Sequence, residues 1–127
     1  MNALTDEWVF KAEDDYRSAE ALLYEIETPI ADTASFHCQQ CAEKYLKAYL
    51  QEKEIEFPRQ HDLIPLMEFC RTVDDSFESL RIDLGRLDRY AIAIRYPGAT
   101  TTISLAKDAF GAAERVRSFI RKKLGLS

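Results

Sequence analysis

The sequence predicts an all-α protein, an up-and-down four-helix bundle with one additional short helix. Apolar residues recur at spacings of three and four through most of the chain, which is the period of an amphipathic helix. Only four glycines and four prolines interrupt the 127 residues, so long regular elements with few turns are expected. Residues 99–103 alone have strand-like composition, and this single short stretch beside Ser104 is interpreted as a loop.

The first helix is expected from about Thr5 to Glu25, with Thr5 as its N-cap and Thr28-Pro29 as its stop. Its predicted buried stripe consists of Trp8, Ala12, Tyr16, Ala19, Leu22, Leu23 and Ile26. Its outer face is predicted to be solvated and carries Lys11, Glu13, Asp14, Arg17 and Glu20.

The second helix is predicted to be the centre of the bundle and to run to about Lys53, after a cap at Asp32, Thr33 or Ser35. One side is apolar and includes small residues that let a neighbouring helix approach closely: Ala34, Cys38, Cys41, Ala42, Tyr45, Leu46 and Tyr49. The other side is a dense polar stripe: His37, Gln40, Glu43, Lys44, Lys47 and Gln51.

Residues 54–60 are expected to form an extended connector, because Phe57 precedes a proline and no helical period continues. Asp62 is a good N-cap for a short third helix. The apolar spacing from Phe77 to Ile94 predicts a fourth helix that stops at Tyr96-Pro97-Gly98.

The last helix is expected from about Ser104 to Lys123, with Leu105 among its buried residues and Gly125 as its stop. No repeat or linker divides the chain, and 127 residues suffice for one core, so residues 1–127 are predicted to be a single domain.

Composition excludes several protein classes. The chain is 46% hydrophobic and 31% charged, as in soluble globular proteins, and no apolar run is long enough to span a bilayer. The first residues lack the features of a signal peptide, so a cytoplasmic location is expected, with reduced cysteines. Cys38 and Cys41 have the spacing of a zinc or redox half-site but no second ligand pair, so core packing is expected, with no metal or cofactor.

A net charge of -5 argues against a broad nucleic-acid-binding surface and leaves room for a local basic cleft. If the bundle gathers its cationic side chains, such a cleft would suit a phosphate-bearing ligand. The residues predicted to bind it are Lys44, Lys47, Arg59, His61, Arg95 and Tyr96.

Structural alternatives exist for these residues. Glu43, Lys44 and Lys47 also fit an ordinary solvated helix face paired along the helix. Arg95 could bond the exposed carbonyls of a helix end, and His61 could hold a neighbouring helix.

Three motifs follow one another along the chain: His37-x-x-Gln40-x-x-Glu43-Lys44-x-x-Lys47-Ala48-x-Leu50, then His61-Asp62-Leu63, then Arg95-Tyr96-Pro97-Gly98. With an amphipathic helix at each end, the chain resembles the HEPN domain family. The resemblance implies a small stand-alone helical protein that forms homodimers. It also implies a minimal nucleotidyltransferase encoded beside it, in a toxin-antitoxin or related system, and nucleotide or RNA binding.

Many members of that family are metal-independent ribonucleases that use an Arg followed, one to two helical turns later, by a His. The seven residues before His37 contain no Arg, and the nearest Arg before His61 is Arg59, only two positions upstream. A binding module is therefore the favoured function. A divergent ribonuclease that uses His61 with Arg59 or Arg95 is the alternative, so whether the protein is an enzyme stays open.

Overall fold

The computed structural model of the protein describes residues 1–90 and 96–127. Within these residues the chain forms five α-helices and two short 3-10 helices, and it forms no strand. The helices are α1 (Ala3–Tyr24), α2 (Ala31–Glu52), α3 (Leu63–Arg71), α4 (Arg81–Leu87) and α5 (Ile103–Lys123). The all-α prediction is confirmed. None of the helices described is long and apolar enough to cross a membrane.

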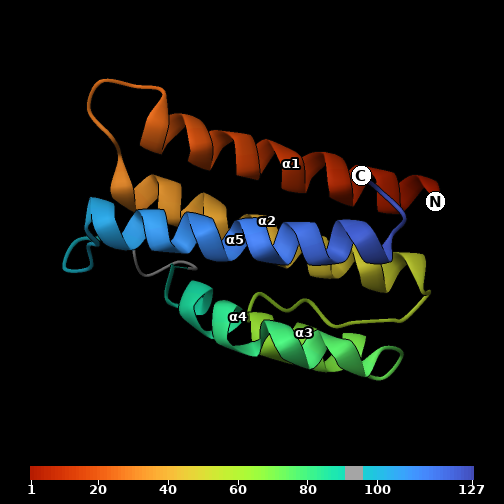
Figure 1. Ribbon diagram of the computed structural model, residues 1–127. Helices are drawn as coiled ribbons and strands as arrows, with labels where there is room; N and C mark the ends of the chain where they lie inside the picture. The colour runs from red at the N-terminus through yellow and green to blue at the C-terminus, as the bar shows by residue number, and fades with distance from the viewer. Residues whose placement is uncertain (91–95) are drawn as a thin grey trace.

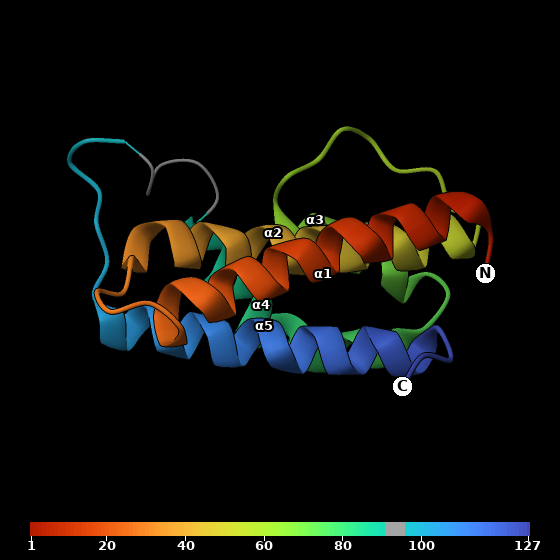
Figure 2. The ribbon, with the colours of Figure 1, turned by 90° about the horizontal axis from the view of Figure 1, so that it is seen from above.

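The central helix of the bundle is α2 (Figure 1, Figure 2). It is antiparallel to α1, because the Asn2 side chain at the start of α1 donates to the Gln51 carbonyl near the end of α2 (3.3 Å). α5 packs against both of them, while the shorter α3 and α4 lie on the side away from α1 (Figure 1). Thirteen of the 22 residues of α2 are buried, which confirms its predicted place at the centre.

The start of α1 differs from the prediction. The N-cap is Asn2, not Thr5: the Asn2 side-chain oxygen accepts hydrogen bonds from the backbone N–H and the hydroxyl of Thr5 (2.8 and 2.9 Å). Asn is at least as good an N-cap as Thr, so the helix begins earlier. Thr5 is then buried inside the first turn, with its hydroxyl bonded.

No side chain caps α2, where Ile30 occupies the N-cap position. The predictions of Asp32, Thr33 or Ser35 as the cap are therefore wrong. The Asp32 carboxylate instead accepts a hydrogen bond from the backbone N–H of Thr101 (2.8 Å). This bond ties the loop before α5 to the first turn of α2.

The predicted fourth helix, residues 77–94, is shorter and less regular than expected. A 3-10 helix (Asp75–Leu80) precedes α4 and a second one (Asp88–Tyr90) follows it. An apolar spacing of three suits a 3-10 helix as well as an α-helix, so the pattern predicts burial better than helix type. The apolar stripe is buried as far as Leu87, and its last part, residues 91–94, lies outside the described residues.

At the ends of α5, the predicted N-cap is wrong and the predicted stop is confirmed. Thr102, not Ser104, is the N-cap, and its hydroxyl accepts a hydrogen bond from the Leu105 N–H (3.1 Å). Leu105 is 48% exposed, so its predicted burial is wrong; the buried face of α5 begins at the next residue, Ala106. Ile26 is 40% exposed, since it lies beyond the end of α1. At the other end, Gly125 follows α5 in the left-handed conformation (φ 76°), as predicted for the stop.

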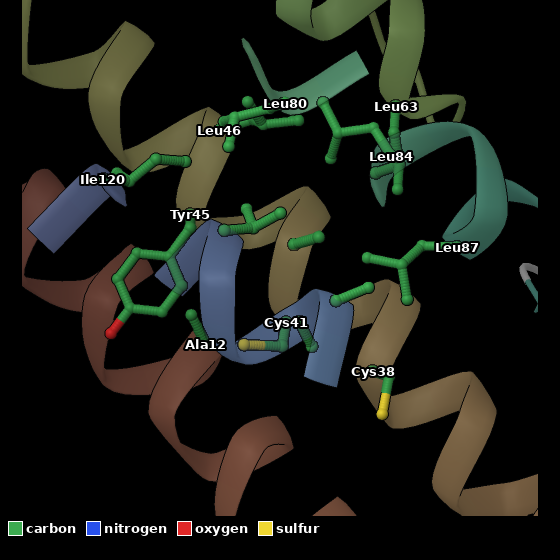
Figure 3. Close-up of a cluster of buried hydrophobic side chains, with 14 of the residues drawn as sticks. Ala12, Cys38, Cys41, Tyr45, Leu46, Leu63, Leu80, Leu84, Leu87 and Ile120 are labelled. Atoms are coloured by element: carbon green, nitrogen blue, oxygen red, sulfur yellow. The ribbon is translucent and has the colours of Figure 1, made fainter. Parts of the chain in front are cut away.

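The predicted apolar side of α2 forms the middle of the core, and side chains from the other four helices meet it (Figure 3). Cys38 and Cys41 are fully buried within this core. Burial raises the pKa of Cys38 to about 12 and the pKa of Cys41 well above its ordinary value. The Cys-x-x-Cys spacing therefore reflects core packing, as the sequence predicts.

An ion-pair cluster on Glu13 fixes α1 against α2 and α5. Glu13 accepts two hydrogen bonds from Arg117 on α5 (2.7 and 2.8 Å) and one from the hydroxyl of buried Tyr45 on α2. Figure 3 shows the Tyr45 hydroxyl beside α1. Burial alone would raise the pKa of Glu13, but its hydrogen bonds to Arg117 and Tyr45 outweigh burial and lower that pKa. The prediction that Glu13 belongs to a solvated face is wrong, since it joins three helices.

Candidate functional site

The candidate site begins where the chain leaves α2. Glu54 adopts a left-handed backbone conformation (φ 56°). The Ile55 N–H donates to the Leu50 carbonyl (2.9 Å) and the Glu54 N–H to the Gln51 carbonyl (3.2 Å). These two bonds form the Schellman motif, which reverses the chain after a helix and usually has Gly at the left-handed position. Residues 54–62, the connector, therefore turn back toward the middle of α2 (Figure 2).

The far end of the connector is fixed at the start of α3. Asp62 occupies the N-cap position as predicted, but its side chain makes no capping hydrogen bond. The Leu63 N–H instead donates to the side chain of Asp88 (2.8 Å), and the Gln39 amide on α2 donates to the His61 carbonyl (3.0 Å). Two distant elements thus hold the residues on either side of Asp62.

The connector borders a surface hollow of about 410 Å³ between itself, α1 and α2. We call it the connector hollow, and it is lined by Trp8, Lys47, Phe57, Pro58, Arg59 and His61. Three of the six residues predicted to bind a ligand therefore meet here. They come from α2 and the connector, and α1 adds the indole ring.

Lys47 lies at the bottom of the hollow and is only 7% exposed. Its Nζ is 3.0 Å from Oε2 of Glu43, one turn earlier on α2, and Glu43 is 4% exposed. The same ammonium group is 5.5 Å from the centre of the Trp8 ring and 6.0 Å from that of Phe57. The predicted pairing along the helix is confirmed for Lys47 and Glu43, but the predicted solvent exposure is wrong: Trp8 and Phe57 lie beside Lys47, and His61 lies beside Glu43.

His61 and Arg59, which lie at the rim of the hollow, are more accessible than Lys47. The His61 side chain is 64% exposed, and its Nδ1 is 3.4 Å from both carboxylate oxygens of Glu43. With Nδ1 turned toward Glu43, Nε2 is the ring nitrogen left for a ligand. Arg59 is exposed and makes no hydrogen bond or ion pair with any residue in 1–90 or 96–127. Its guanidinium group therefore has all its donors available to a ligand.

Lys44 is not part of the lining. Its Nζ is 2.5 Å from Oδ2 of Asp15 on α1, and Nδ1 of His37 is 2.7 Å from the other oxygen of that carboxylate. Asp15 is 7% exposed, so this cluster crosslinks α1 and α2. The sequence brings Lys44 and Lys47 within one helical turn, but their ammonium groups have different carboxylate partners.

Two predicted residues remain, and only one of them lies in the part of the chain that the structure describes. Arg95 lies outside the described residues. Tyr96 is 62% exposed and is not among the lining residues. The loop that follows it is tied by Thr101 to Asp32 at the N-terminal end of α2, whereas Lys47 is in the C-terminal half of that helix.

Trp8, Phe57 and Pro58 line the hollow but were not predicted as site residues. Trp8 fits the apolar stripe of the first helix, so its half-buried ring is indistinguishable from a core residue by periodicity. Phe57-Pro58-Arg59 does carry a local signal, because an aromatic ring next to a cation in a loop is common where bases and phosphates bind. The complete hollow offers guanidinium and imidazole donors at its rim and two aromatic rings inside.

Comparison with known proteins identifies the family of the chain. Residues 5–123 match the model of the HEPN domain. No curated protein matches the chain. Among solved structures it is similar to ST0689, an archaeal HEPN homologue, at 24% identity and a TM-score of 0.73, over 94% of this chain and 96% of that one. It is also similar to TT1696 from Thermus thermophilus, at 21% identity and a TM-score of 0.74, over 94% of this chain and 97% of that one. The two structures share the fold, the family model spans nearly all of the sequence, and the chain therefore belongs to the HEPN domain family.

Proposed function

We propose that the protein is a binding module whose connector hollow holds a nucleotide or a segment of RNA. The observation that carries the proposal is the meeting of a lysine, an arginine, a histidine and two aromatic rings around one hollow of about 410 Å³. Guanidinium and imidazole groups suit phosphate oxygens, and exposed ring faces suit bases. The volume falls within the range of roughly 300 to 1,000 Å³ that is usual for small-ligand pockets.

Lys47, Arg59 and His61 have different roles in this proposal. The charge of Lys47 is already balanced by Glu43, so it mainly shapes the bottom of the hollow. Arg59 and His61 lie at the rim and supply the donors for a phosphate group. In a chain of net charge -5, these rim donors provide a local attraction for an anion that the protein as a whole does not.

Trp8 gives this proposal a direct test, since it is the only tryptophan in the chain. Adenosine monophosphate and a short adenylate RNA are titrated into the protein while the Trp8 fluorescence is recorded, and calorimetry provides the affinity. Arg59→Ala and His61→Ala should each weaken binding about tenfold, the loss expected for one charge-assisted hydrogen bond. Neither should change the melting temperature much, because both side chains are exposed.

Arg17→Ala is the matched control, since Arg17 is exposed on another face of α1 and pairs only with Asp14 among the residues described. Its affinity should equal that of the wild type. Unchanged affinity in both site variants, or no binding of either ligand, would refute the proposal. Arg95→Ala and Tyr96→Ala belong to the same series, because the sequence predicts that these residues bind the ligand.

We also propose that the protein is a homodimer that acts with a minimal nucleotidyltransferase, as the family resemblance suggests. Large apolar side chains on the described surface support an interface, for example Phe10 (67% exposed) and Ile82 (73% exposed). Sedimentation should report twice 14.6 kDa at micromolar concentration. A monomer there would contradict the dimer, and failure to co-purify with the product of an adjacent nucleotidyltransferase gene would contradict the partnership.

A ribonuclease is the second candidate function, because Arg59 and His61 line the same hollow. A cation beside the phosphate and an imidazole able to move a proton are the groups that metal-independent cleavage needs. RNA incubated with the protein in a chelator would then be cut, and His61→Ala would abolish cutting. If the RNA stays intact after incubation with the wild-type protein, the ribonuclease function is contradicted and binding is the function that remains.

A further inference from the structure

The indole of Trp8 borders a second hollow next to the connector hollow. This second hollow has a volume of about 250 Å³, and we call it the Leu4 hollow. Its lining residues are Leu4, Glu7, Trp8, Lys11 and Gln51. One aromatic ring is therefore shared by two adjacent surface depressions.

The helical positions of the lining residues place the two hollows next to each other along the line where α1 packs against α2, which we call the seam. Leu4, Trp8 and Lys11 follow the spacing i, i+4, i+7 and so share one face of α1. Lys47 and Gln51 are four residues apart on α2 and share the facing stripe. The seam between the two helices thus leads from the connector hollow, across Trp8, into the Leu4 hollow.

The two hollows differ in chemistry. The connector hollow has an arginine and a histidine at its rim, whereas the Leu4 hollow is bordered by an apolar side chain, the indole, the Gln51 amide, one cation and the carboxylate of Glu7. Leu4 is 54% exposed in the first turn of α1, so its side chain is accessible to a ligand. Lys11 is exposed, and its amine has no hydrogen bond or ion pair within the part of the chain that the structure describes. An apolar surface with a free amine at its edge suits a base and its flanking phosphate.

We infer that the ligand is a short single-stranded oligonucleotide that crosses Trp8, with one phosphate at Arg59 and His61 and the neighbouring nucleotide over Leu4 and Lys11. This inference rests on the proposed function of the connector hollow. The strand is single because a duplex hides the base faces that stacking on aromatic rings requires. It is short because the acidic remainder of the protein repels a longer polyanion.

The test is a length series. Adenosine monophosphate and adenylate RNAs of two, four and eight nucleotides are titrated into the full-length protein, with Trp8 fluorescence and calorimetry as readouts. Affinity should rise about tenfold or more from the mononucleotide to the dinucleotide or tetranucleotide, the gain expected from one additional charge-assisted hydrogen bond, here from Lys11. It should rise little from four to eight nucleotides, and an adenylate-uridylate duplex should bind more weakly than the single strand.

Variants separate the two hollows. Lys11→Ala and Leu4→Ala should lower the affinity for the tetranucleotide several-fold and leave that for the mononucleotide unchanged, whereas Arg59→Ala should lower both. Lys107→Ala is the control, because Lys107 lies on α5 beside Tyr24, at the opposite end of α1. Equal affinity for one and four nucleotides, or a tetranucleotide affinity indifferent to Lys11 and Leu4, would overturn the inference while the proposed function stands. Absence of binding by all the nucleotides would instead refute the proposed function itself.

Discussion

The buried pair Glu43 and Lys47 provides a test of how the bottom of the connector hollow is stabilised. The two groups are 3.0 Å apart, and both side chains are less than 10% exposed. Lys47→Met keeps most of the side-chain volume but removes the charge, and with it the ammonium contacts with the rings of Trp8 and Phe57. It leaves the Glu43 carboxylate buried, with the Gln40 amide (3.4 Å) and the exposed His61 ring as its remaining polar partners among the residues described.

The magnitude follows from the burial of the pair. Removing one partner of a buried ion pair leaves the other charge uncompensated, which typically costs about 3 kcal/mol or more of the free energy of unfolding. For a domain of this size, that loss lowers the melting temperature by roughly 10 °C. Glu43→Gln should cost a similar amount, because it leaves the Lys47 ammonium group without its carboxylate. Changing both residues should cost clearly less than the sum, since no charge is then left alone.

A double-mutant cycle measures this coupling. Wild type, both single variants and the double variant are unfolded by urea under the same conditions, and the free energies of unfolding are compared. A coupling free energy of about 2 kcal/mol is expected, within the range known for residues in contact. Single-variant effects that add to within about 0.5 kcal/mol would show that the pair does not stabilise the hollow, which would refute this reasoning.

Three further predictions concern stability. Glu54→Gly should raise the free energy of unfolding by about 1 kcal/mol in urea denaturation, because Gly adopts the left-handed conformation without strain; no gain would contradict it. Glu13→Gln should lower the free energy of unfolding by roughly 1.5 to 3 kcal/mol, since Arg117 loses a charged acceptor. An unchanged free energy of unfolding would contradict the role of Glu13 in joining three helices. Asp74→Ala should lower it by about 1 kcal/mol at pH 7 through loss of a helix cap. The ion pair with Lys123 lowers the pKa of Asp74 from 3.8 to about 2. The ionised Asp74 carboxylate therefore stabilises the fold above its unfolded pKa of 3.8. The stability difference between Asp74→Ala and wild type, measured by thermal melts, should vanish as the pH falls from 3.8 to about 2.

The fold could be predicted because its main determinant is local. The apolar stripe of α2 is visible in the sequence at helical period, and the structure buries every residue predicted for it. The role of Glu13 could not be predicted, because its partners lie 32 and 104 positions further along the chain. A carboxylate on the edge of an amphipathic helix has the same sequence pattern whether it meets water or an arginine on another helix.

The candidate site could be predicted in part for a related reason. Lys47, Arg59 and His61 were identified by residue type and the family resemblance, and the structure places them around one hollow. Lys44 and Lys47 have equivalent positions in the helical pattern, but the connector covers only Lys47, and this depends on the chain reversal at Glu54. A non-glycine residue gives no sequence signal for such a reversal.

A crystal structure of the protein with adenosine monophosphate or a short adenylate RNA tests the central claim most directly. The proposal predicts the phosphate at the rim of the connector hollow, about 2.7 to 2.9 Å from the donors of Arg59 or His61, with the base against Trp8. Other hollows with cationic residues include one at Arg86 and Arg89, with a volume of about 360 Å³, and one at Arg115, Arg117, Lys122 and Lys123, with a volume of about 690 Å³. Ligand bound there, with the connector hollow empty, would contradict the claim.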